Sequence, residues 1–205
     1  MPGSKALISL LPALLVALWG CAPAAMMGPP VPLAVDTPLE ISAAAVGSGP
    51  VTPEGEGGCS LLWGCRGVSG QLSGRVALSE RLEVGGVVYG GNISGAGAGV
   101  YGRLWYVDAP RFRLGGELQG GFAWAAAALP MAGMVSERVW ITASPSVGLR
   151  HLSVVRVPLG VGVQLSERWW LQGELAVGWD PWRVFQDPEQ VHLQGALSLS
   201  WRPAL

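Results

Sequence analysis

The sequence predicts an all-β protein, a closed antiparallel up-and-down transmembrane β-barrel of about ten strands that follows a signal peptide and a Pro-rich linker. Its segments alternate apolar and polar residues with a period of two, which puts the two kinds of side chain on opposite faces of a strand. Charged residues make up 13% of the chain and its only lysine is Lys5, so the Lys and Glu coat of a soluble sheet protein is missing. The formal net charge of −1 offers no basic surface to nucleic acid.

Residues 1–20 have the form of a secretory signal peptide, with one lysine as the positive residue and Ala6–Leu18 as the apolar stretch. The stretch ends in Leu-Trp-Gly-Cys at Cys21, which resembles the lipobox of bacterial lipoproteins. That resemblance implies cleavage before Cys21 and lipid modification of its sulfur, which would tether the chain to a membrane. Trp19 departs from the small residues usual at its position, and ordinary cleavage after residues 22–25 is the alternative.

Residues 21–38 are rich in Pro and Ala without periodicity, which indicates an extended linker. Residues 39–205 carry the alternating segments and are predicted to form the barrel domain. The clearest segment is Arg168–Trp179, where Trp stands at both ends of the apolar face. At roughly 3.3 Å rise per residue and roughly 40° tilt, the distance from Trp169 to Trp179 is roughly 25 Å, the height of the apolar band of a membrane barrel.

The other segments precede and follow this one, and each has an apolar face. They are expected at residues 39–45, 68–78, 82–89, 100–106, 112–124, 125–135, 139–147, 155–165 and 191–201. The segment 125–135 is the weakest, because almost all its residues are small and apolar, and no polar loop is visible near Trp124. Together with Arg168–Trp179 they make about ten strands, an even number as in single-chain barrels.

Four very short polar connections join pairs of these segments, and three of them share the sequence Ser-Glu-Arg. They are Ser79-Glu80-Arg81, Asp108-Ala109-Pro110, Ser136-Glu137-Arg138 and Ser166-Glu167-Arg168. Tight polar turns suit antiparallel hairpins, and mostly longer connections alternate with them. The short turns are therefore predicted at one end of the barrel, together with both ends of the barrel domain, and the long loops at the other end.

The aromatic residues assigned to the apolar face gather near the two ends of the strands. Tyr106, Phe112, Trp169 and Trp201 fall at the short-turn end, and Phe122, Trp124 and Trp179 fall at the loop end. Two aromatic girdles around an aliphatic band are typical of membrane interfaces, whereas a soluble barrel of the lipocalin kind turns its apolar face inward. The pattern favours an apolar face that meets lipid and a polar face that lines the lumen.

In this pattern Leu39–Trp201 resembles the small outer-membrane β-barrels of Gram-negative bacteria. The resemblance implies an integral protein of the cell outer membrane, with the lipid bilayer as its partner and its long loops outside. Such barrels commonly end on an aromatic residue that the assembly machinery reads, whereas here four residues follow Trp201. The resemblance is one of pattern and carries no site residues.

Charged residues on the polar face are the first candidate site. Four of them are predicted at similar depth in the lumen: Arg75, Arg103, Glu117 and Glu174. Charges inside a narrow barrel must pair, which predicts a plug of salt bridges, with a selectivity ring in a small channel as the alternative. Trp105, Trp140 and Trp170 also point inward near the short-turn end, which disfavours an open pore.

Cys59 and Cys65 lie in the first long connection, and export implies an oxidising compartment. They predict a disulfide bond that stiffens this loop, while Cys21 is accounted for by lipidation. The apolar tip of the loop could contact other envelope proteins or lipid, or fold over the barrel mouth.

Pro130, Pro145 and Pro158 fall in three successive segments, in the half of the barrel near the long loops. Proline removes a hydrogen bond from a ladder. We therefore expect bulges or shortened strands there, or else a weakened seam that opens toward lipid.

His151 and His192 are expected at the loop end beside acidic residues, an arrangement similar to the outer-membrane proteases but without a motif of that family. We expect no enzyme, no metal site and no cofactor. The function predicted is a structural or surface-interaction role for an outer-membrane barrel with a polar, plugged lumen. The alternatives are a narrow pore for small solutes and a membrane-embedded hydrolase that uses the His and acid rim.

Overall fold

The computed structural model describes residues 33, 38–50, 67–91, 95–121, 124–149, 155–179 and 191–203. Twelve strand segments of these residues form one sheet: β1 (Leu39–Pro50), β2 (Gly67–Ala77), β3 (Leu82–Gly91), β4 (Gly95–Ala109), β5 (Phe112–Gly121), β6 (Trp124–Ala128), β7 (Met131–Ser136), β8 (Val139–Ala143), β9 (Ser146–Leu149), β10 (Val155–Gln164), β11 (Trp169–Trp179) and β12 (His192–Trp201). Within this part of the chain, no helix has the length and apolar character needed to cross a bilayer.

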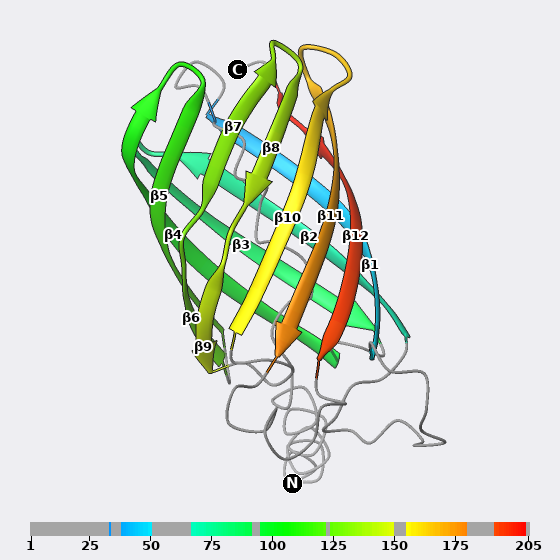
Figure 1. Cartoon of the computed structure of the whole chain (residues 1–205). Helices are drawn as coiled ribbons and strands as arrows, with labels where there is room; N and C mark the ends of the chain where they lie inside the picture. Colours follow the sequence, from blue (N-terminus) through cyan, green and yellow to red (C-terminus); the bar gives the residue numbers. More distant parts are fainter. Residues whose placement is uncertain are drawn as a thin grey trace, which may run out of the picture.

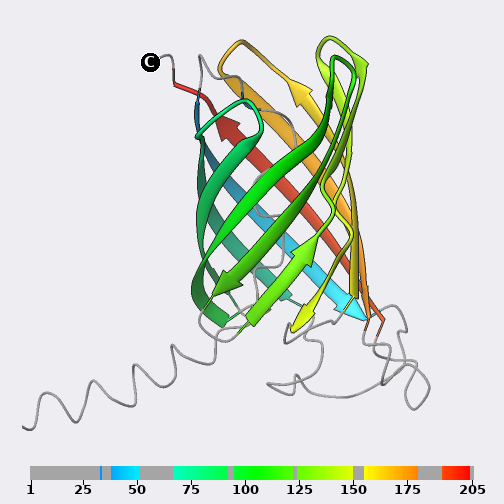
Figure 2. The same ribbon diagram turned by 90° about the vertical axis from the view of Figure 1, so that its left-hand side faces the viewer.

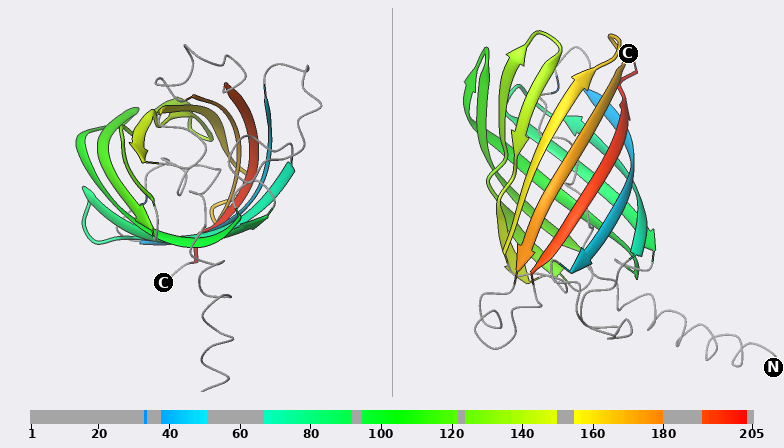
Figure 3. Two further views of the ribbon diagram at one scale, coloured as in Figure 1. Left: turned by 90° about the horizontal axis from the view of Figure 1, so that it is seen from below. Right: turned by 45° about the vertical axis from the view of Figure 1, so that its right-hand side comes forward.

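The sheet closes on itself as an antiparallel barrel (Figure 1). β1 is bonded on one side to β2 and on the other to β12, with Ile41 opposite both Gly74 and Trp201. The first and last strands thus meet along ten residue pairs. Seen along its axis, the ladder runs around a central lumen (Figure 3). The predicted fold class, an all-β closed up-and-down barrel, is confirmed.

β6 and β7 are two parts of one strand, and so are β8 and β9. On β5, Glu117 pairs with Ala128 of β6 and Leu114 pairs with Met131 of β7, so two residues separate these pairs on both sides. The pairings of β6 with β9, of β7 with β8 and of both β8 and β9 with β10 keep their register in the same way. The twelve segments therefore make ten strands, as predicted.

The bulges or shortened strands expected at the prolines are not what the structure has. Pro130 and Pro145 lie in the two-residue gaps between the strand segments, and the register does not shift across either gap. Pro158 lies inside β10, opposite Ala176. The register shifts instead in β4, just after Trp105, and near the end of β7.

The short turns lie together at one end of the barrel, with the end of β12 beside them (Figure 2). The β2–β3 and β10–β11 turns share one arrangement, in which the N–H of Leu78 donates to the oxygen of Leu82 at 2.8 Å and that of Leu165 to Trp169 at 2.9 Å. In the β7–β8 turn, Ser136 instead pairs with Val139. Two of the three Ser-Glu-Arg turns therefore have the same backbone hydrogen bonds.

Apolar side chains cover the outside of the barrel and charged ones lie inside. Leu118 and Leu175 are 73% and 65% exposed, whereas Glu40 and Arg103 are 0% and 2% exposed. The faces follow from side-chain alternation, because successive residues of a strand point to opposite sides of the sheet. This distribution is the inverse of a soluble barrel and matches the predicted orientation.

Candidate functional site: a charged and aromatic lumen

Three glutamates and three arginines meet inside the barrel near the short-turn end. They are Glu40, Glu83, Glu117, Arg75, Arg103 and Arg202. Arg75 bridges two carboxylates, with its Nη2 3.0 Å from Glu40 Oε2 and its Nη1 2.9 Å from Glu83 Oε2. Arg103 does the same, with its Nη1 3.3 Å from Glu83 Oε2 and its Nη2 2.5 Å from Glu117 Oε2. The opposite charges balance, so this lumen cluster has no net charge.

The register of the strands builds the lumen cluster. Glu40 lies directly opposite Arg75, and Arg103 lies opposite Glu83 on one side and Glu117 on the other. Opposed side chains on one face of a sheet are close enough to bond. Gly85 stands between Arg75 and Tyr101, and a Cβ there would lie 2.5 Å from the tyrosine ring, so the glycine leaves the space that the ring occupies.

Arg202 ties the last strand to the first. Its Nε donates to Glu40 Oε2 at 2.8 Å, and its guanidinium lies 4.7 Å from the centre of the Trp170 ring. Burial lowers the pKa of the Arg202 guanidinium, and the charge of Glu40 opposes this shift. The hydroxyls of Ser42 and Ser200, 2.7 Å apart, cross the same junction. The residues that follow the last barrel strand thus begin with a side chain bound inside the lumen.

Glu174 does not join the lumen cluster, which corrects the prediction that it shares a network with Arg75 and Arg103. It pairs with Arg156 of the adjacent strand β10, and Arg156 Nε donates to Gln194 Oε1 at 2.9 Å. Counting residues from the short turns estimates depth along the axis. It does not give the position around the barrel, and β11 lies away from β2–β5.

Aromatic rings fill the lumen around the charges. Trp105 is 1% exposed and its Nε1 donates to Glu83 Oε1 at 3.0 Å, while the Arg103 guanidinium lies 5.4 Å from the ring centres of Trp105 and Tyr101. Trp140 and Trp170 pack together with Ala132, nearer the short turns. All three tryptophans predicted to point inward do so.

Leu33 also lies in the lumen, although it precedes the first strand. Its side chain is 2% exposed, and its backbone N–H donates to Glu83 Oε1 at 3.4 Å. The Glu83 carboxylate is bound inside the barrel by Arg75 and Arg103. Leu33, which precedes β1, therefore lies inside the barrel against the lumen wall, which nothing in the sequence pattern indicates.

Trp124 points into the lumen, so its predicted place in the outward girdle is wrong. It is 4% exposed, its Nε1 donates to the Tyr89 hydroxyl at 3.0 Å, and it packs with Val87 and Tyr101. The physical reason is the chain reversal between β5 and β6: Trp124 begins a new strand and pairs with Gly121. Alternation cannot be continued through a turn that carries no polar residue.

The other predicted girdle residues at the short-turn end face outward. Tyr106, Phe112, Trp169 and Trp201 are 61%, 44%, 42% and 37% exposed. Trp169 and Trp201 are directly opposite each other on adjacent strands. Trp179, at the far end of β11, is half-buried, and Phe122 lies outside the described residues. The predicted aromatic girdle is thus present on the outer face at the short-turn end.

The cysteines and histidines of the sequence fall in different parts of the chain. Cys21, Cys59, Cys65 and His151 lie outside the described residues, so lipidation and the disulfide stay predictions. His192 begins β12, points inward and is 7% exposed. Within the described ranges, no three or more His, Cys, Asp or Glu side chains are grouped so as to hold a metal ion.

One strip of the lumen wall, on β8, β10 and β11, carries buried polar atoms without a hydrogen-bond partner among the described residues. They are Thr142 Oγ1, Gln172 Oε1 and Trp170 Nε1. A Cβ on Gly160 would lie 2.7 Å from Thr142 Oγ1 and 3.3 Å from Gln172 Nε2, so the glycine leaves the space that these side chains occupy. Buried polar groups require partners, which solvent or a polar solute would supply here.

The sequence reasoning missed Glu40 and Arg202 as members of the lumen cluster. The inward direction of both side chains could have been predicted from alternation. Glu40 lies two residues from Ser42, on the polar face of β1, and Arg202 lies two residues from Ser200 of β12. Their pairing required the knowledge that the first and last strands are neighbours.

No family model matches the chain, and no curated protein matches it either. Among solved structures, it is similar to a de novo designed transmembrane β-barrel, with 11% identity over 84% of this chain and 100% of that chain and a TM-score of 0.41. It is also similar to the KdgM porin in complex with disordered oligogalacturonate, with 9% identity over 80% and 99% and a TM-score of 0.47. A mutant porin of Rh. blastica matches with 11% identity over 65% and 44%, at a TM-score of 0.37.

Proposed function

We propose that this chain is a non-enzymatic outer-membrane β-barrel whose lumen is closed and whose long loops contact partners at the surface. The observation that carries closure is the lumen cluster, because its buried carboxylates and guanidiniums, bonded from strand to strand along β1–β5, fill the lumen side of that wall. The apolar outer wall and the aromatic girdle at the short-turn end support a membrane location.

Three further contacts support a closed lumen. Trp105 donates to the Glu83 carboxylate, Trp170 stacks against Arg202, and the backbone N–H of the buried Leu33 donates to the same Glu83 carboxylate. Charges that are paired with one another along the lumen wall leave no ring of free charges to select ions. We accordingly expect a scaffold and not a conduit.

Recording the conductance of the purified mature chain in planar bilayers tests this proposal. We expect no reproducible steps from the intact chain, and none from a variant that lacks residues 22–37, because the lumen cluster stays in place without Leu33. Steps of constant size from the intact chain would contradict closure.

A narrow pore for small polar solutes is the second candidate. The strip formed by Thr142, Gly160 and Gln172 favours it, since these groups face the lumen with unbonded polar atoms. Swelling of liposomes that contain the intact chain, in small neutral sugars, distinguishes the two candidates: a closed barrel gives the rate of empty liposomes.

We further propose that residues 1–20 are a signal peptide, that Cys21 carries lipid and that Cys59 and Cys65 are bridged. The support for these is the sequence pattern alone. Cell fractionation with mass spectrometry of the mature amino terminus would report the compartment, the cleavage site and the lipid together, and non-reducing peptide mapping would report the bridge.

A further inference from the structure

Three prolines weaken three successive ladders at nearly the same height. The N–H of Gly115 donates to the oxygen of Pro130 at 2.9 Å, that of Leu129 to Pro145 at 2.9 Å, and that of Ser144 to Pro158 at 3.3 Å. In a hydrogen-bonded antiparallel pair, the second residue normally donates a bond in return. Proline has no N–H, so each of these pairs keeps one of its two bonds.

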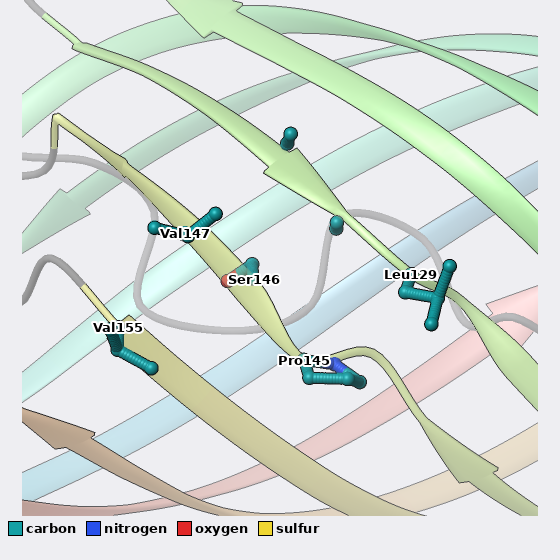
Figure 4. Close-up of a pocket in the computed structure, with 7 residues that line it drawn as sticks. Leu129, Pro145, Ser146, Val147 and Val155 are labelled. Carbon is teal, nitrogen blue, oxygen red and sulfur yellow. The ribbon is translucent and has the colours of Figure 1, made fainter.

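A hollow of about 420 Å³ lies in the outer wall beside this weakened region. It is lined by Ala127 and Ala128 of β6 and Leu129 just after it, by Pro145 and the adjoining Ser146 and Val147 of β9, and by Val155 of β10 (Figure 4). Leu129 and Val147 are 45% and 55% exposed, so the hollow opens on the apolar outer face.

The shape of the hollow follows from one row of residues across the sheet. Leu118 of β5 lies opposite Ala127, Ala127 opposite Val147, Val147 opposite Val155, and Val155 opposite Trp179. These outward side chains are large at both ends of the row and small in between. Ala127, Val147 and Val155 line the hollow, which is therefore a trough in the outer wall, and Leu118 and Trp179 stand beyond it at the two ends of the row.

We propose that this trough binds one acyl chain of a bilayer lipid, in the half of the membrane that faces the long loops. The trough is continuous with the apolar wall that lipid would surround, and a void there forfeits dispersion contacts that a flexible hydrocarbon chain restores. Its lining is apolar except for Ser146, which suits hydrocarbon and no charged or sugar ligand. The interrupted ladders let the floor adjust to the chain.

Photolabelling in bilayers tests the site. The intact mature chain is reconstituted in phosphatidylethanolamine and phosphatidylglycerol vesicles that contain a phospholipid with a diazirine-bearing acyl chain, and labelled peptides are mapped by mass spectrometry. We expect labelling of peptides from residues 124–149 and 155–164 to exceed that of β1 and β2 roughly fivefold, the ratio given by about 1 kcal/mol of preference.

The matched variants are Ala127→Leu, which fills the trough, and Ala98→Leu, which adds the same side chain to an exposed position of β4. Loss of the excess labelling in Ala127→Leu but not in Ala98→Leu supports the site. Uniform labelling of all outer strands, or equal labelling in both variants, overturns it. Labelling by a free diazirine fatty acid but not by the phospholipid overturns the assignment to a bilayer lipid.

Discussion

The wall formed by β1–β5 and the wall formed by β6–β9 are built on different principles. The first consists of uninterrupted strands of 10 to 15 residues and holds five of the six charged residues of the lumen cluster. The second consists of segments of 4 to 6 residues without a charged side chain, broken at Pro130 and Pro145.

This difference shows that neighbouring strands of one barrel can be joined either by backbone and side-chain bonds together or almost entirely by backbone hydrogen bonds. In β1–β5, a buried ion pair joins each pair of neighbouring strands, so backbone hydrogen bonds and side-chain bonds both stabilise this wall. In β6–β9 the inward residues are mostly small, and the backbone ladder is nearly alone in joining the strands. The wall with fewer side-chain bonds is also the wall that loses ladder hydrogen bonds.

The largest expected effect comes from the charged wall. Glu83→Gln leaves Arg75 and Arg103 short of a shared carboxylate, and breaking a buried pair costs about 3–5 kcal/mol. Urea unfolding of the chain reconstituted in lipid vesicles measures this. Glu80→Gln, in the exposed turn three residues earlier, is the control and should change stability by less than about 0.5 kcal/mol. Equal stability of the two variants would show that the ion pairs of the lumen cluster do not stabilise the barrel.

Hydrogen exchange compares the two walls directly. Because one missing ladder hydrogen bond is worth about 1 kcal/mol, we expect amides of residues 124–149 to exchange roughly fivefold faster than those of β2 and β3. Mass spectrometry of peptides from the chain in lipid bilayers gives both rates in one sample. Equal exchange rates would contradict the claim that the prolines weaken this region, and with it the claim that the floor of the trough adjusts to an acyl chain.

Trp124→Phe tests the corrected orientation at the edge of the second wall. It removes the bond from the indole to the Tyr89 hydroxyl, for a loss of about 1 kcal/mol. Brominated lipid chains quench the fluorescence of tryptophans that face lipid. Because the Trp124 indole lies in the lumen, the variant should lose only fluorescence that these lipids do not quench. Trp169→Phe is the control, since it should remove quenched fluorescence. The opposite result would put Trp124 on the lipid face.

Pro158→Ala is expected to have the smallest effect. The new N–H can return a hydrogen bond to Ser144, but the unfolded chain regains freedom, so stability should change by less than about 1 kcal/mol. Exchange at the neighbouring amides of β8 and β9 should slow nonetheless. A loss of more than about 2 kcal/mol would mean that the proline ring itself, which is buried, holds the wall together.

The fold class, the strand count, the end at which the short turns lie and the face of most side chains could all be predicted from the amino-acid sequence. This was possible because alternation with period two and polar turn residues are local signals. From them, inward Arg75, Arg103 and Glu117 and outward Trp169 and Trp201 could be assigned without a structure.

Which of these residues contact one another depends on how the barrel closes. Glu40 and Arg202 are 162 positions apart and bond because the barrel closes, while Glu174 lies on another strand of the circumference and pairs with Arg156. Trp124 faces inward because an apolar turn reversed the chain without a local mark. Barrel closure fixes neighbours around an axis, whereas a sequence pattern records only depth along a strand and the face on which a side chain lies.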